Sequence, residues 1–189
     1  MDFVEHHFYH VYNRGNQKQL IFFKPHNYDF FLKKMEKELS PHCDILSFCL
    51  MPNHFHWLLH VKPLANPEID SSPLSNAIGI LLRSYTRAIQ KQNGFTGSLF
   101  QQKTKSKQLQ SENQFRICVN YIHQNPMKAD LVAKMEDWEY SSFQDYCGIR
   151  QNSLCNQEMF YTYLGIGREE DFYRISYKML RDADIEGLF

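Results

Sequence analysis

The chain has 189 residues with 21 basic and 21 acidic side chains, and 43% of its residues are apolar, a composition that suits one folded domain and excludes a disordered or fibrous protein. No apolar run reaches the roughly 18 residues of a membrane span, and the N-terminus lacks the basic-then-apolar pattern of a signal peptide, so we expect no membrane association. The five cysteines include no C-x-x-C pair, which favours a reducing compartment, the cytoplasm, over a disulfide framework.

The first half of the chain predicts three strands and two helices. Residues 8–13 are short, aromatic and β-branched and end in a turn signal, which is typical of a strand. Residues 25–39 place apolar side chains at helical spacing between lysines and glutamates. Residues 44–50 and 54–61, joined by a short Met-Pro-Asn turn, predict an antiparallel hairpin, and residues 74–92 predict a second amphipathic helix.

The second half predicts one more strand, a third helix and a helical tail. Residues 98–109 alternate as a strand or hairpin does. Ser111 is the predicted N-cap of a helix that Pro126 ends, and residues 169–181 have helical character. The order strand, helix, strand, strand, helix, strand predicts an α+β fold: a ferredoxin-like antiparallel sheet with helices on one face, followed by the extra helix.

His54-Phe55-His56 is the first candidate functional motif. Strand side chains alternate, so His54 and His56 point to one face with Cα atoms roughly 6–7 Å apart. The residues of opposite parity, from Phe55 to Val61, are all apolar. We therefore expect the apolar face to be the core and the histidines to lie on the other, open face, where two imidazoles can bind one divalent metal. Two half-exposed polar residues without a ligand, or a structural zinc site with Cys49, are the alternatives.

Tyr121 and Asn125 are the second candidate pair. They stand at i and i+4 near the end of the third predicted helix and therefore share one helical face. A phenol oxygen can attack phosphorus and form a covalent phosphotyrosine, and an amide oxygen can complete a metal site with the two histidines. The alternative is that Tyr121, one of 11 tyrosines, packs against the sheet.

Positive charge is concentrated in the middle of the neutral chain. Residues 83–128 carry eight basic side chains and one acidic one, Glu112, whereas residues 129–189 carry six basic and twelve acidic side chains. Such a basic segment is typical of a polyanion site, and the alternative is a solvated face balanced by the acidic tail. The candidate phosphate-binding residues are one stripe of the second helix and three alternating residues of the last predicted strand: Arg83, Arg87, Lys91, Lys103, Lys105 and Lys107.

Five segments together resemble the REP-associated tyrosine transposases, a branch of the single-tyrosine HUH (histidine–hydrophobic–histidine) transposases. They lie in the family's order within residues 8–146: Y-H-V-Y-N-R-G-N at 9–16, M-P-N-H-F-H at 51–56, G-S-L-F-Q at 97–101, Y-I-H-Q-N-P at 121–126 and W-E-Y-S-S at 138–142. Met127 and Asp130 depart from the valine and glycine expected after the proline, and we expect Asp130 to alter the turn that follows the helix.

The resemblance implies a catalytic domain that acts on single-stranded DNA with a divalent metal, Mg²⁺ or Mn²⁺. His54 and His56 match the HUH metal ligands, and Asn125 matches the third ligand. Tyr121 matches the nucleophile. The implied enzyme is a transposase, a DNA nuclease and strand transferase that cleaves and rejoins strands through a 5′-phosphotyrosine intermediate.

The resemblance also implies a partner and a division of the chain. The implied ligand is single-stranded DNA with hairpin, or palindromic, elements, and the implied place of action is the cytoplasm at the nucleoid. Residues 1–146 are predicted to form the transposase domain, and residues 147–189 a helical extension without an assigned role. Homodimer and monomer both stay open. The alternative function is a non-catalytic module, derived from a transposase, that binds hairpin DNA or RNA.

Overall fold

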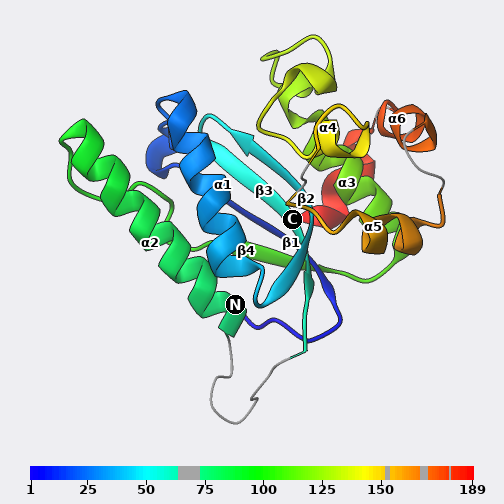
Figure 1. Ribbon diagram of the computed structural model, residues 1–189, viewed down its shortest axis with the longest axis horizontal. Coiled ribbons are helices and arrows are strands. Elements are labelled where there is room, and N and C mark those ends of the chain that lie inside the picture. Colours follow the sequence, from blue (N-terminus) through cyan, green and yellow to red (C-terminus); the bar gives the residue numbers. More distant parts are fainter. Residues whose placement is uncertain (64–72, 152–153, 167–169, 179) are drawn as a thin grey trace.

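The computed structural model describes residues 1–63, 73–151, 154–166, 170–178 and 180–189, which form three layers (Figure 1). The middle layer is an antiparallel sheet of four strands in the order β2-β3-β1-β4. The strands are β1 (Phe8–Arg14), β2 (Cys43–Met51), β3 (His54–Val61) and β4 (Lys105–Leu109). This order is that of a ferredoxin-like α+β fold, so the predicted fold class is confirmed.

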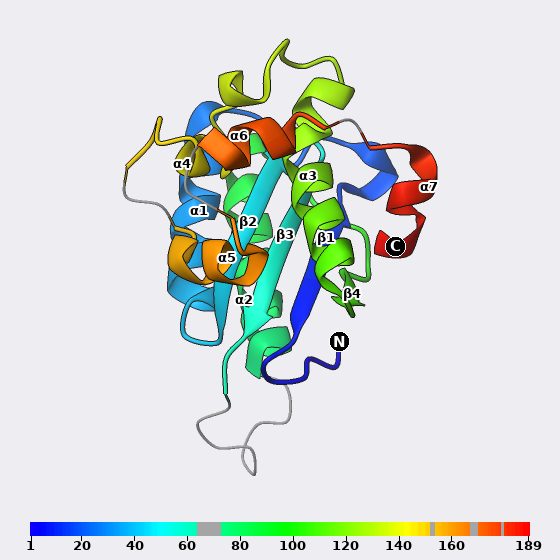
Figure 2. The ribbon, with the colours of Figure 1, turned by 90° about the vertical axis from the view of Figure 1, so that its right-hand side faces the viewer.

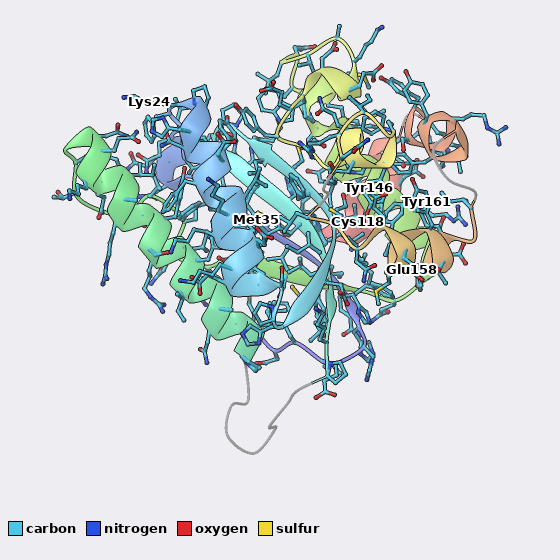
Figure 3. The ribbon with its side chains drawn as sticks, viewed as in Figure 1. Lys24, Met35, Cys118, Tyr146, Glu158 and Tyr161 are labelled. Carbon is cyan, nitrogen blue, oxygen red and sulfur yellow. The ribbon has the colours of Figure 1, made fainter. Side chains whose placement is uncertain are left out.

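Two helices cover one face of the sheet, α1 (Pro25–Leu39) and α2 (Pro73–Asn93) (Figure 1). The Phe31 ring of α1 lies 5.7 Å from that of Phe55 and 5.9 Å from that of Trp57. Met35, labelled in Figure 3, is also fully buried on this side of α1. Because strand side chains alternate, the odd-numbered residues of β3 belong to this face. Burial of each such side chain contributes roughly 1.5–3 kcal/mol to folding.

A third helix, α3 (Glu112–Lys128), lies along the opposite face of the sheet (Figure 2). Ser111 caps it as predicted, since its hydroxyl accepts a hydrogen bond from the Gln114 N–H at 3.2 Å. The prediction that Pro126 ends this helix is wrong, because Pro126 lies inside its last turn. A proline removes only its own N–H donor, and the bond from the Ala129 N–H to the Asn125 oxygen continues the turn past it.

The fourth predicted strand is shorter in the structure than the alternating pattern suggests. β4 covers only residues 105–109, and before it Phe100 makes one isolated bridge to Gly15. Polar side chains alternate through this segment, but only its last part pairs with β1. Alternation alone therefore overestimates the strand.

The C-terminal part packs against α3 and the sheet (Figure 2). Its helices are α4 (Phe143–Tyr146), α5 (Gln157–Leu164), α6 (Glu170–Ser176) and α7 (Asp182–Ile185), and the short 3-10 turns of the chain are η1 (Asn16–Lys18), η2 (Met135–Asp137) and η3 (Glu186–Leu188). Phe160, Phe172 and Leu188 join the same hydrophobic core as the strands. No helix among the described residues is long and apolar enough to cross a membrane.

Candidate active site

The histidine pair lies on the sheet face that α3 covers. His54 and His56 lie on the same face of β3, separated by Phe55, and their ring centroids are 5.1 Å apart. On the neighbouring β1, Arg14 lies opposite His54 and Tyr12 opposite His56. The expectation that this face is open is wrong, because α3 packs over it: His56 is only 4% exposed and His54 is half-buried.

Helix α3 brings Tyr121 and Asn125 to the histidines. The Tyr121 ring meets the His56 ring edge to face, with centroids 5.2 Å apart. The Asn125 side chain donates from Nδ2 to the main-chain oxygen of Tyr121 at 2.6 Å. The Asn125 carboxamide also lies close enough to His54 to act on the pKa of that imidazole, which it raises. The structure thus brings the four candidate residues together between β3 and the second half of α3.

Burial sets the protonation of these groups. It lowers the pKa of His54 to about 4, and it lowers the pKa of His56 well below its ordinary value, with His10 and His54 acting in the same direction. Both imidazoles are therefore uncharged at neutral pH and offer lone pairs. Burial also raises the pKa of Tyr121 to about 12, although the neighbouring Asn125 side chain acts in the opposite direction.

A pocket of about 300 Å³ opens at His54, His56 and Tyr121. The rest of its wall comes from β1, from β4 and the residues before it, and from the C-terminal end of the chain: Tyr12, Asn13, Arg14, Gln101, Lys103, Lys105 and Phe189. Three basic side chains in this wall make the pocket suitable for an anion such as a phosphodiester.

The structure places the two predicted groups of basic residues on different sides of the sheet. The lysine row (Lys103, Lys105 and Lys107) and the helix stripe (Arg83, Arg87 and Lys91) are both exposed. Lys103 and Lys105 line the pocket, and the cross-strand partners of Lys105 and Lys107 are Tyr12 and His10 of the histidine face. Helix α2, which carries the helix stripe, packs on the other face (Figure 1). The pocket wall therefore includes two residues of the lysine row, Lys103 and Lys105, and none of the helix stripe.

Sequence reasoning misses three residues at this site: His10, Arg14 and Phe189. His10 is fully buried, and its Nε2 lies 2.9 Å from Nδ1 of His56. The Nε atom of Arg14 is buried without a hydrogen-bond partner. The Phe189 ring lies 5.4 Å from the ring of Tyr121. His10 has the same parity as Tyr12 on the first predicted strand, residues 8–13, and Arg14 continues that parity one residue beyond it, whereas Phe189 lies outside every motif.

The donor set fits a divalent cation. Asn125 uses its Nδ2 on the helix, which leaves its amide oxygen free to face the His54 side. An amide oxygen together with two neutral imidazoles suits Mn²⁺ or Mg²⁺, with water completing the shell. Within the part of the chain that the structure describes, no group of three or more His, Cys, Asp or Glu side chains is placed to hold a metal ion. A metal ion held by His54 and His56 would therefore need a ligand of another type, such as the Asn125 amide. The zinc alternative loses support for the same reason, since Cys49 forms no such group with the two histidines.

Comparison with known proteins identifies the family of the chain. The family model described as "Transposase IS200 like" matches residues 3–125, a range that contains all four candidate residues. The chain belongs to the IS200-like transposase family. Its fold is similar to a solved structure described as the REP-associated tyrosine transposase bound to a REP hairpin, with a TM-score of 0.62 and 16% identity over 81% of this chain and 86% of that one. No curated protein matches the chain.

These comparisons confirm the family and the fold predicted from the sequence. At 16% identity, the similarity to the solved structure supports the fold alone. Transposases of the IS200-like family act on DNA and generally use a divalent metal. The chain is therefore a DNA transposase by family, and its candidate residues lie inside the matched range.

Proposed function

We propose that this IS200-like transposase is an active DNA-strand transesterase that cleaves and rejoins hairpin-bearing single-stranded DNA through Tyr121. The observation that carries the proposal is the meeting of Tyr121 with His54, His56 and Asn125 beside a basic pocket. A module that only binds hairpins needs a basic surface, but it has no use for a phenol next to two neutral imidazoles. The arrangement therefore favours catalysis over binding alone.

In the proposed reaction the phenol oxygen of Tyr121 attacks the phosphorus of a DNA phosphodiester and displaces the 3′ oxygen of the preceding nucleotide. The phenol loses its proton and the departing 3′ oxygen takes one up, so the products are a 5′-phosphotyrosine and a free 3′ hydroxyl. A 3′ hydroxyl of the same or another strand reverses the step. The phosphotyrosine conserves the phosphodiester bond, so rejoining needs no nucleoside triphosphate.

His54, His56 and Asn125 would hold the divalent ion, Mg²⁺ or Mn²⁺. When bound, the ion supplies positive charge to the phosphate oxygens. The chain's own basic groups in the pocket wall, Arg14 among them, orient the strand by attracting its phosphates. Since burial raises the pKa of Tyr121 to about 12, positive charge near the phenol favours its ionisation.

The proposed substrate is a single strand with a hairpin. The solved transposase of similar fold is described as bound to a REP hairpin. In this chain the lysine row follows β4, the edge strand next to β1, and ends at the pocket. We also propose that residues 1–146 form the transposase domain, that residues 147–189 are an extension reaching the pocket at Phe189, and that the protein acts in the cytoplasm at the nucleoid.

The test is a covalent adduct on a denaturing gel. A hairpin-bearing oligonucleotide labelled at its 3′ end is incubated with the protein and Mg²⁺ or Mn²⁺, and the label is expected to migrate with the protein. Tyr121→Phe should abolish the adduct but leave DNA binding unchanged, because it removes only the attacking oxygen. Tyr12→Phe is the matched control, since Tyr12 is the other phenol of the pocket.

Other outcomes of the same experiment contradict the proposal in distinct ways. Binding without an adduct would favour the non-catalytic hairpin-binding module. Cleavage without an adduct would indicate a metal phosphodiesterase that uses water. An adduct that persists in Tyr121→Phe and disappears in Tyr12→Phe would move the nucleophile to β1.

A further inference from the structure

His10 is a buried residue that the proposed reaction does not use. It lies on β1 and its side chain is fully buried on the histidine face. Its Nε2 lies 2.9 Å from Nδ1 of His56, and its Nδ1 lies 3.0 Å from the main-chain oxygen of Leu188. The His10 and His56 rings are stacked, with centroids 5.1 Å apart and planes 22° apart. Both ring nitrogens of His10 are therefore occupied.

These two contacts determine where the hydrogens lie. A carbonyl oxygen only accepts, so Nδ1 of His10 carries a hydrogen and donates it to Leu188. Two buried imidazoles in contact stay neutral, so Nε2 of His10 carries no hydrogen and accepts. Nδ1 of His56 is then the donor of the bond between the two rings. A neutral His56 with its hydrogen on Nδ1 has its lone pair on Nε2.

We propose that His10 is a positioning residue that holds His56 in the tautomer with hydrogen on Nδ1, so that the Nε2 lone pair is available in the pocket. The inference rests on the proposed function, since that lone pair is the one that would bind the divalent ion. The Leu188 oxygen belongs to the same relay, because it fixes the hydrogen of His10 and thereby the hydrogen of His56. The end of the chain thus orients a candidate ligand on the sheet.

The expected size of the effect follows from the general behaviour of ligating histidines. Partners that hold the second ring nitrogen of such a histidine change metal affinity by about 10–100-fold when they are removed. Without an acceptor at His10, the buried Nδ1–H of His56 has no partner, and the other tautomer, with hydrogen on Nε2, competes. That tautomer cannot bind a metal through Nε2.

Two substitutions of His10 separate packing from hydrogen bonding. His10→Leu fills much of the space but offers no acceptor, whereas the amide of His10→Gln can accept from His56 and donate to the Leu188 oxygen. His60→Leu is the matched control, because His60 lies on the same face of β3 but contacts Asp44 instead of the pocket. The readout is Mn²⁺ affinity, measured from the electron paramagnetic resonance signal of free Mn²⁺.

His10→Leu is expected to weaken Mn²⁺ binding by about tenfold or more. His10→Gln should recover most of the affinity, and His60→Leu should leave it unchanged. Independently, long-range ¹H–¹⁵N spectra of the metal-free wild type with labelled histidines should show hydrogen on Nδ1 of both His10 and His56. Hydrogen on Nε2 of His56, or wild-type Mn²⁺ affinity in a folded His10→Leu, would overturn the relay.

A His56→Ala variant separates failure of the relay from failure of the proposed function. If His56→Ala binds Mn²⁺ as tightly as wild type, the metal site itself is wrong and the relay is overturned with it. If His56→Ala loses binding and His10→Leu keeps it, only the relay is wrong. The spectra use the wild-type protein, so they decide the tautomer even if His10→Leu does not fold.

Discussion

Asn125 donates a hydrogen bond to the main-chain oxygen of Tyr121, one helical turn earlier on α3, at 2.6 Å. The bond uses the nitrogen end of the carboxamide and leaves the oxygen end for the sheet, where the side chain interacts with His54. The i, i+4 spacing therefore does two things: it places the phenol and the amide on one face, and it orients the amide. This orientation is what would let Asn125 act as the third ligand of the proposed metal site.

We expect Asn125→Ala to slow adduct formation by about tenfold, equivalent to about 1.4 kcal/mol of transition-state stabilisation. His54→Ala and His56→Ala should abolish the adduct, because an amide is the weakest of the three ligands, and EDTA should stop the wild-type reaction. The measurement is the single-turnover rate across a Mn²⁺ titration, in which added Mn²⁺ should partly restore Asn125→Ala by mass action. Cleavage that continues unchanged in EDTA would contradict the metal assignment.

Phe189 lies over the candidate nucleophile. Its ring lies 5.4 Å from the Tyr121 ring and 5.3 Å from the Tyr12 ring, yet it is 51% exposed. Because this ring lines the pocket together with Tyr121, we expect a DNA phosphate that reaches the phenol to displace it, and each aromatic contact is worth about 0.5–1.5 kcal/mol. Phe189→Ala should therefore speed adduct formation by up to about tenfold.

The control for Phe189→Ala is Ile149→Ala, an exposed apolar residue outside the pocket. Both variants keep the Leu188 oxygen that accepts from His10. Initial rates at saturating oligonucleotide measure the effect. A slower Phe189→Ala would mean that the ring holds a DNA base in place and does not obstruct the pocket.

His123 makes stability depend on pH. Its ring is fully buried, with Nε2 2.7 Å from the Ser142 hydroxyl oxygen, and burial lowers its pKa from 6.5 to about 3. Between these two pH values the unfolded chain takes up a proton that the folded chain excludes. The stability that neutral His123 provides is therefore complete above pH 6.5 and is lost as the pH falls toward 3, by up to about 1.4 kcal/mol per pH unit.

His123→Gln removes this titration. The variant should be less stable than wild type near neutral pH, since the amide fills the site poorly, but its free energy of unfolding should fall less steeply in acid. Urea unfolding at several pH values between about 4 and 7 measures both slopes. Equal slopes for the two proteins would show that His123 does not contribute.

Local patterns in the sequence predict elements well where a single face is buried. The helix over residues 25–39 and the strand over residues 54–61 have the predicted bounds, because each carries one clean apolar period. The burial of His56 could not be predicted in this way, since it depends on α3 packing over β3 from far along the chain. Phe189 illustrates the same limit, because no local period marks a residue that reaches the pocket from the end of the sequence.

The backbone conformation at Asp130 is indicated by the family resemblance and not by the hydrophobic periodicity of the sequence. The resemblance led us to expect glycine at this position, and the structure has the left-handed conformation there, with φ of 54°. Glycine adopts this region without steric cost, whereas a side chain is strained in it. The turn after α3 therefore has the geometry that suits the expected glycine, so the expectation that Asp130 alters this turn is wrong, and Asp130 bears the strain.

We expect the lysine row, and not the helix stripe, to contact the phosphates of single-stranded DNA. If Lys103, Lys105 and Lys107 contact phosphates on the way to the pocket, each contact releases a condensed counterion, and affinity for single-stranded DNA falls with salt at a log–log slope of roughly −0.7 per contact. Alanine at all three positions should flatten this slope by about two units and weaken every oligonucleotide alike, since phosphate contacts do not read sequence.

Alanine at Arg83, Arg87 and Lys91 is the matched control, because it removes the same charge from the face of the sheet that α1 and α2 cover (Figure 1). Long-range attraction of the strand falls equally in both triple variants, so only direct contacts separate their slopes. Titrations of the wild type and both triple variants at several salt concentrations, with and without a hairpin in the oligonucleotide, give the six slopes needed. If the slope is flatter in the helix-stripe variant and unchanged in the lysine-row variant, the strand binds on α2, away from Tyr121. If alanine at the helix stripe flattens the slope only for oligonucleotides with a hairpin, the hairpin stem contacts the helix stripe. The lysine row and the helix stripe would then bind two different parts of one substrate.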